Sequence, residues 1–193
     1  MSVSRVWFSI VVFGCVTLVA SAENFATFPE QKEFASPDKR YVLRSIDPPR
    51  GSSDFSGMFH SLILEDRVTG QSRRLYDYLS KVAVAWSGDR IIVTDYVSRR
   101  SARALVLSAD ATSEAYIVDR NDLAGRIPGD QAACLRGNDH VFVEAVRMED
   151  RTLTLRVWGY GAHDRNGFRL DCELNLDQGA ASCHQSGHAT PEP

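Results

Sequence analysis

A short turn followed by an apolar strand recurs along this chain, and this repeat constrains the fold more than any other feature. The sequence reads SPDKRYVL at residues 36–43 and WSGDRIIV at 86–93, and a less similar copy, RGNDHVFV, follows at 136–143. The copies are about fifty residues apart, within the range of repeated supersecondary units such as propeller blades. The repeat therefore predicts three successive β units.

Strands with one buried face are the main element that the rest of the sequence predicts. In residues 168–177, Phe168, Leu170 and Cys172 alternate with Arg169 and Asp171, as expected for an antiparallel sheet with one solvated face. Between 120 and 131 we expect at most one helical turn, at 122–124. The fold class is therefore all-β, with antiparallel propeller-like hairpins and strands at 41–46, 59–65, 73–76, 79–86, 91–96, 102–107, 115–119, 140–148, 153–158, 168–176 and 180–184.

The N-terminus has the pattern of an export signal. Arg5 precedes an apolar run at residues 6–20, and ASA at 20–22 supplies the small residues that signal peptidase requires. The run is short for a membrane span, which needs ~20 apolar residues. We expect residues 1–22 to be a cleaved signal peptide, no membrane span after cleavage, and a periplasmic or secreted location. Cys15 leaves an alternative open, because VFGC at 12–15 loosely resembles a lipoprotein cleavage box, and lipidation would tether the chain to a membrane.

The remaining chain is long enough for one ordinary domain, which we place at residues 23–186, followed by a disordered tail at 187–193. The formal net charge is −3 and both signs are interspersed. Nucleic-acid binding needs a basic stripe that can neutralise phosphates. The sequence has no such stripe, so we expect no nucleic-acid partner.

Three cysteines remain after the signal, and an exported protein meets an oxidising compartment in which disulfides persist. Cys172 and Cys183 flank a turn at 177–179, so a hairpin brings them near each other. We expect them to form a disulfide, provided that the register places both sulfur atoms on the same face. Cys134 then stays free as a small buried residue.

Three phrases resemble the blade repeat of TolB-type, WD40-like periplasmic propellers. These are SPDKRYVL at 36–43, LILEDRVTGQSRRL at 62–75 and VAWSGDRIIV at 84–93. In that repeat an SPDG turn leads into the innermost strand, a D-x-x-T-G turn joins the next two strands, and a tryptophan closes the unit. Asp66, Thr69, Gly70 and Trp86 match these features, whereas the turn at 87–89 lacks the proline and the turn at 136–139 departs further.

The length of the chain conflicts with a closed propeller. Propellers close with roughly four to eight blades, and this chain has strands for about three. Open blades leave sheet edges that promote aggregation. We therefore expect a partial propeller, a sandwich or a barrel.

No catalytic or metal motif stands out. Ser52, Ser53 and Ser56 lie near His60, but no G-x-S-x-G elbow is present. Cys183, His184 and His188 are close in sequence, yet they lie where we expect a disulfide and a tail, so we expect no metal ion and no cofactor. The pairs Arg73–Arg74 and Arg99–Arg100 are typical of solvated sheet edges. The alternative is that they bind an anionic partner.

Two loops carry the candidate binding residues. Residues 47–57 are rich in proline, glycine and serine and form a long loop. There Arg50, Asp54 and Phe55 are candidates. The second loop is the glycine-rich bend at 159–167, around which Trp158, Tyr160 and His163 form a candidate contact patch.

The sequence favours a non-catalytic function, in which an exported β domain binds a protein or a cell-envelope component through loops on a rigid scaffold. Two alternatives remain open. One is a small envelope hydrolase, for which a cleft with converging titratable groups is the distinguishing feature. The other is a structural subunit that completes an oligomeric propeller with other copies.

Overall fold

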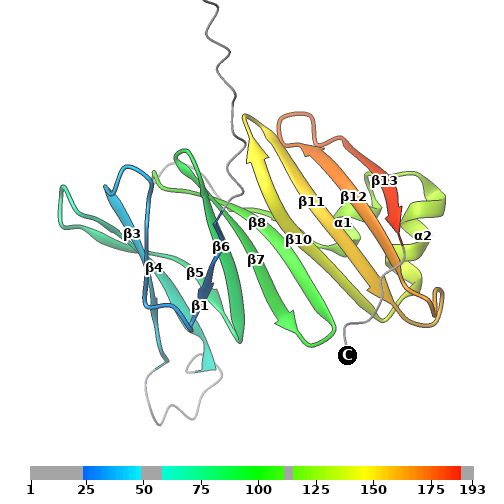
Figure 1. Cartoon of the computed structure of the whole chain (residues 1–193), viewed down its shortest axis with the longest axis horizontal. Helices are drawn as coiled ribbons and strands as arrows, with labels where there is room; N and C mark the ends of the chain where they lie inside the picture. Colours follow the sequence, from blue (N-terminus) through cyan, green and yellow to red (C-terminus); the bar gives the residue numbers. More distant parts are fainter. Residues whose placement is uncertain (1–23, 49–57, 111–114, 188–193) are drawn as a thin grey trace, which may run out of the picture.

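The computed structural model describes residues 24–48, 58–110 and 115–187. Strands dominate this part of the chain, and they form three consecutive groups of antiparallel neighbours (Figure 1). The first unit comprises β2 (Glu33–Ala35), β3 (Tyr41–Ile46), β4 (His60–Asp66) and β5 (Ser72–Tyr78). The second comprises β6 (Lys81–Ser87), β7 (Arg90–Ser98), β8 (Ser101–Ser108) and β9 (Tyr116–Val118). The third comprises β10 (His140–Glu149), β11 (Thr152–Tyr160), β12 (Phe168–Asn175) and β13 (Ala181–Gly187).

Within each unit every strand pairs with its neighbour in sequence. The first unit is a separate four-stranded sheet. The second and third are joined into one nine-stranded sheet because the start of β10 runs parallel to the start of β8, and β1 (Ala26–Phe28) adds to β6. Neither sheet closes on itself. The barrel, one of the three alternatives that the sequence allowed, is therefore wrong, and the described fold is an open, mainly antiparallel assembly.

The turns show which parts of the sequence repeat are structural. Ser36 and Ser87 each begin the connection between the first two strands of a unit. The Ser36 hydroxyl accepts from the Tyr41 N–H, and Gly88 takes a positive φ. In the third unit the equivalent connection is the turn at Asp150, not the segment at 136–139. The predicted third copy is therefore wrong, because residues 136–139 end a helix and lead into β10.

A second turn also repeats, between the third and fourth strands of a unit. The Gly70 N–H donates to the Asp66 carbonyl over 2.8 Å, and the Gly179 N–H donates to the Asn175 carbonyl over the same distance. In both turns the first side chain accepts from the backbone two residues on, at 2.9 Å for Asp66 and 3.0 Å for Asn175. The D-x-x-T-G segment thus forms the hairpin that the sequence predicted, and a chemically similar turn ends the third unit.

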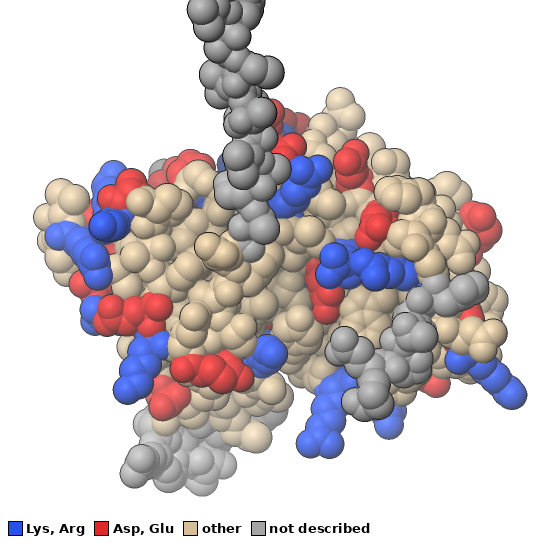
Figure 2. All heavy atoms as spheres, viewed as in Figure 1, with Lys and Arg blue, Asp and Glu red and all other residues tan. Residues whose placement is uncertain are grey.

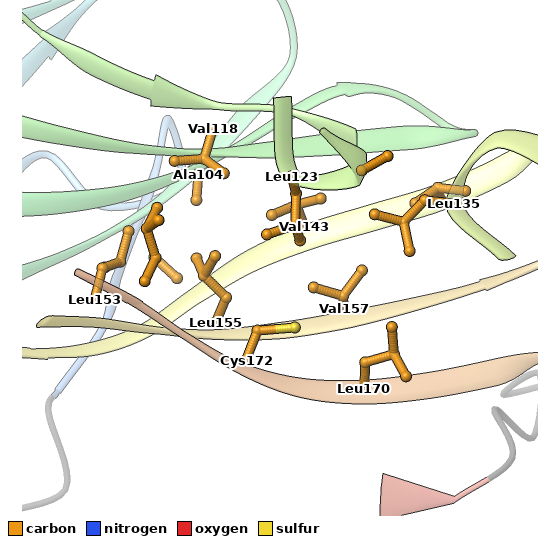
Figure 3. Packing of buried hydrophobic residues seen from close by; sticks show 14 of the residues in the cluster. Ala104, Val118, Leu123, Leu135, Val143, Leu153, Leu155, Val157, Leu170 and Cys172 are labelled. Carbon is orange, nitrogen blue, oxygen red and sulfur yellow. The ribbon is translucent and has the colours of Figure 1, made fainter. Parts of the chain in front are cut away.

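The three units pack on one another through two hydrophobic cores, called here the first core and the second core. One lies between the first and second units and contains Leu43, Leu64, Val84, Ile91 and Leu105. The other lies between the second and third units, where Figure 3 shows Ala104 and Val118 facing Leu155, Val157 and Leu170. The second unit is therefore buried on both faces. This explains why β7 has five consecutive buried residues, Ile91–Asp95, whereas β11 alternates strictly between buried and half-buried residues.

Two helices cover the second core, and only one of them was expected. α1 (Arg120–Ala124) begins at Asp119, whose carboxylate accepts from the N–H groups of Asn121 and Asp122, and it inserts the buried Leu123. α2 (Gly129–Gly137) contradicts the expectation of at most one helical turn. Its burial is limited to Ala132 and Leu135, so it lacks the apolar stripe that marks an amphipathic helix. The run of good helix formers after Pro128 was the available signal.

The disulfide follows the hairpin register. Cys172 and Cys183 are directly paired across β12 and β13, with 4.1 Å between their Cα atoms, and they form a disulfide. Cys134 is a free thiol on α2, and burial raises its pKa. The predicted pairing is confirmed, and it ties β13 to the core.

Candidate binding face

The third unit has one buried face and one solvated face, and the solvated face holds the strongest cluster of contact residues. We call this surface the outer face, meaning the side chains of β10–β13 that point away from the second core. Because side chains alternate along a strand, Leu155 and Val157 point into that core while Arg156 and Trp158 point outward. Figure 1 shows both helices on one side of β11–β13, so they leave the outer face uncovered.

Two stacked aromatic pairs lie side by side on the outer face. Phe142 stacks on Trp158 with ring centroids 4.1 Å apart, and His140 stacks on Tyr160 at 4.4 Å. Both are cross-strand pairs of β10 and β11. Such pairs stabilise a sheet, and because Phe142 is only 7 % exposed, the half-buried rings of His140, Trp158 and Tyr160 are the ones that face solvent. Trp158 and Tyr160, two of the predicted binding residues, are thus brought together.

A close backbone approach holds this aromatic cluster in place. A Cβ atom at Gly159 would lie 2.3 Å from the carbonyl oxygen of His140, so only glycine permits the observed spacing of β10 and β11 there. Gly159 sits between the two outward aromatic residues of β11. The glycine that the sequence suggested as part of a bend is instead a strand residue required by packing.

His163 does not join this cluster. Its side chain packs on Gly137 at the end of α2, where a Cβ atom would lie 2.8 Å from the His163 Cβ. The bend itself is anchored, because the Asp164 N–H donates to the Asn138 side chain and the N–H groups of Gly161 and Gly167 both donate to the Asp164 carbonyl. The predicted contact patch of Trp158, Tyr160 and His163 is therefore divided between two places. Arg50, Asp54 and Phe55 lie outside the described residues.

Charged side chains complete the outer face; the sequence placed Arg169 and Asp171 on a solvated face but did not identify them as binding residues. Across the four strands, Glu144 pairs in register with Arg156, Arg156 with Asp171, and Asp171 with His184. Next to this row, Arg169 lies opposite Trp158. Figure 2 shows basic and acidic side chains interspersed over the part of the surface formed by these strands. The alternating pattern at 168–177 was the signal that could have revealed them.

The two arginines of this face combine a shielded Nε atom with the lack of a salt bridge among the described residues. The Nε atoms of Arg156 and Arg169 are shielded from solvent and have no hydrogen-bond partner among the described residues, and neither side chain has a salt bridge there. Tyr96 contacts the edge of this face, donating its hydroxyl to Glu144 over 3.3 Å. Burial and the Glu144 charge raise the pKa of Tyr96 to about 12.

A second polar cluster is buried between the first and second units. Asp95 is 2 % exposed; it accepts a hydrogen bond from the Tyr76 hydroxyl and forms a salt bridge with Arg103 at 3.1 Å. The Arg103 guanidinium also donates to the Tyr76 oxygen. Burial and the Asp95 carboxylate raise the pKa of Tyr76. Because the three residues come from β5, β7 and β8, they hold the first two units together.

Two hollows in the described surface have charged walls that are already engaged. The larger, about 310 Å³, is lined by Arg40, Asp66 and Arg73. Arg40 and Asp66 form a salt bridge at 3.0 Å, and Arg73 donates to the carbonyls of Ser108 and Asp110. The smaller, about 200 Å³, lies beside the N-terminal end of α1. Arg73 and Arg74 both lie in β5, the last strand of the four-stranded sheet, where Arg74 is exposed and Arg73 is bonded to the second unit.

The described residues contain no group of three or more His, Cys, Asp or Glu side chains placed to hold a metal ion. His60 lies 3.1 Å from Asp47 and its ring stacks on Tyr78, whereas Ser52, Ser53 and Ser56 lie outside the described residues. Among the described helices, none is long and apolar enough to cross a bilayer. No family model, no curated protein and no solved structure matches this chain.

Proposed function

We propose that this chain is an exported, non-catalytic domain that binds a protein or a cell-envelope component through the outer face of its third unit. The proposal places the protein in the periplasm or outside the cell, after removal of residues 1–22. The observation that carries it is the outer face itself, where two stacked aromatic pairs adjoin two arginines that lack an acidic partner among the described residues.

The composition of the outer face supports binding. Tryptophan, tyrosine, phenylalanine and arginine are the residues most enriched at the centre of protein interfaces. Trp158 is only half-buried, so its ring has surface left to cover. A partner that covered Trp158 would also exclude water from Arg156 and Arg169, which strengthens any ionic contact they make.

The scaffold we propose is propeller-like, with three blades and no closure. Three properties support it: each unit is a sequential four-stranded meander, its turns repeat, and neighbouring units pack through separate cores. Each blade of such a scaffold packs one face on the next, so the last blade presents an unpaired face. A rigid blade face is a suitable platform for binding.

The test is retention of envelope components on the immobilised protein, compared between wild type and two variants. Trp158→Ala removes the central aromatic residue of the outer face. Ile46→Ala removes an aliphatic side chain that is 54 % exposed on the first unit and serves as the matched control. Circular dichroism establishes that both variants are folded.

The proposal expects a retained component that is lost with Trp158→Ala and kept with Ile46→Ala. Equal retention by all three proteins would overturn the outer face as the binding surface. Turnover of envelope glycans or peptides by the purified protein would overturn the non-catalytic assignment.

A further inference from the structure

We propose that the outer face binds the same face of a second copy of this chain, in a two-fold symmetric dimer. This inference rests on the proposed function, because it names the partner of the same surface. It follows from the order of charges across the four strands, which is complementary to itself.

The solvated side of the first unit gives a useful contrast. There Arg44 forms salt bridges with Glu33 at 3.0 Å and with Glu65 at 3.2 Å, so one arginine is neutralised by two carboxylates on neighbouring strands. On the outer face Arg156 lies in register between Glu144 and Asp171, yet it forms no salt bridge with either among the described residues. Arg156 and Asp171 are therefore available to a second molecule, whereas Glu144 also accepts a hydrogen bond from the Tyr96 hydroxyl.

A row of polar side chains, three of them charged, runs across the sheet in the order Glu144, Arg156, Asp171, His184, on β10, β11, β12 and β13 respectively. A two-fold axis parallel to the strands, lying between β11 and β12, places β10 opposite β13 of the second copy and β11 opposite β12. Arg156 then faces Asp171 of the second copy, and Glu144 faces His184 of the second copy. Each such contact occurs twice, as in every isologous interface.

The same axis also matches the neighbouring row. Trp158 lies on β11 and its register partner Arg169 on β12. In the dimer Trp158 faces Arg169 of the second copy, which allows a cation–π contact. At the β10 end of this row Phe142, which is only 7 % exposed, lies beneath the position of Gly187 of the second copy, which has no side chain. Both rows thus fit one symmetry operation, which pairs Arg156 with Asp171 in one row and Trp158 with Arg169 in the other.

The area of the outer face determines how tightly we expect the dimer to associate. Four strands about 4.8 Å apart and about eight residues long give a face of roughly 500 Å² per copy, or about 1,000 Å² in total. Stable interfaces begin near 1,000 Å². We therefore expect a weak, reversible dimer with a dissociation constant on the order of micromolar.

The experiment uses sedimentation velocity on the exported protein, from low micromolar to near-millimolar concentration. Arg156→Glu places like charges opposite Asp171 of the second copy twice, and Asp171→Arg places two arginines opposite each other twice. Each variant alone is expected to weaken the dimer about tenfold or more. An equimolar mixture of the two variants is expected to restore it, because both contacts of the heterodimer then join opposite charges.

The mixture separates contacts between copies from contacts within one chain, since mixing cannot repair an intramolecular pair. Failure of the mixture to restore association would overturn the inference. A wild-type protein that stays monomeric throughout, but still loses its retained envelope component with Trp158→Ala, would overturn the dimer and leave the proposed function standing. A dimer that forms and complements in this way establishes the second copy as a partner of the outer face.

Discussion

The buried Tyr76–Asp95–Arg103 cluster gives the sharpest stability prediction. Asp95→Asn keeps the shape of the side chain and removes its charge. The Asp95 side chain is 3 % exposed and that of Arg103 is 35 % exposed. Breaking a fully buried ion pair costs about 3–5 kcal/mol, and the partial exposure of Arg103 lets water compensate in part. We expect a loss of about 2–3 kcal/mol in the free energy of unfolding.

The matched control is Asp177→Asn. Asp177 pairs with Arg151 at 2.7 Å, a shorter contact than the 3.1 Å of the buried pair, but the two side chains are 58 % and 45 % exposed. Exposed pairs contribute about 0–1 kcal/mol. The control therefore separates the effect of burial from that of distance.

Urea unfolding followed by tryptophan fluorescence measures the free energy of unfolding of both variants, and thermal melts measure their melting temperatures. For a domain of this size about 2–4 °C of melting temperature corresponds to 1 kcal/mol, so Asp95→Asn is expected to melt about 5–10 °C below wild type. A result within about 0.5 kcal/mol of wild type, or equal losses for the two variants, would refute the claim that this cluster joins the first two units.

Three further predictions follow from the described contacts. Reduction of the Cys172–Cys183 disulfide, which closes a separation of 11 residues, is expected to lower stability by about 3 kcal/mol in the loop-entropy treatment, and calorimetry with and without reductant measures it. Gly159→Ala is expected to cost about 1–3 kcal/mol because its Cβ meets the His140 carbonyl, whereas Gly129→Ala, with open space around it, serves as the control in thermal melts. The raised pKa of Tyr96 means that its contribution to stability is complete below pH 10 and is lost as pH rises from 10 to about 12. Tyr96→Phe should therefore flatten the decline of the free energy of unfolding in that window, and an unchanged slope would count against a buried Tyr96.

Sequence patterns predicted the hairpins because turn chemistry is local. Asp66, Thr69 and Gly70 specify their turn through bonds to their own backbone and a positive φ at glycine, so the prediction needed no tertiary information. The disulfide was predictable for a similar reason, since a hairpin of fixed register places its two cysteines opposite each other. These elements depend on residues close in sequence.

The features that the sequence did not predict depend on contacts between distant segments of the chain. α2 carries almost no amphipathic pattern, so its position is set by the second core and by contacts such as that between Gln131 and the Cys183 carbonyl. The third copy of the repeat was misplaced because residues 136–139 have the composition of a turn although they form the end of a helix. The actual turn, at Asp150, contains neither proline nor glycine. Only part of the outer face was predicted, because Phe142 and Trp158 meet through strand pairing and are not close in the sequence.

Hydroxyl-radical footprinting with mass spectrometry tests the central claim that the outer face of the third unit is the binding surface. It compares the oxidation of Trp158 and Tyr160 at low concentration with that in the associated or partner-bound state, and Tyr41 on the first unit serves as the internal reference. The proposed binding mode predicts protection of Trp158 and Tyr160 with no change at Tyr41. Protection of Tyr41 with Trp158 and Tyr160 unchanged would contradict it.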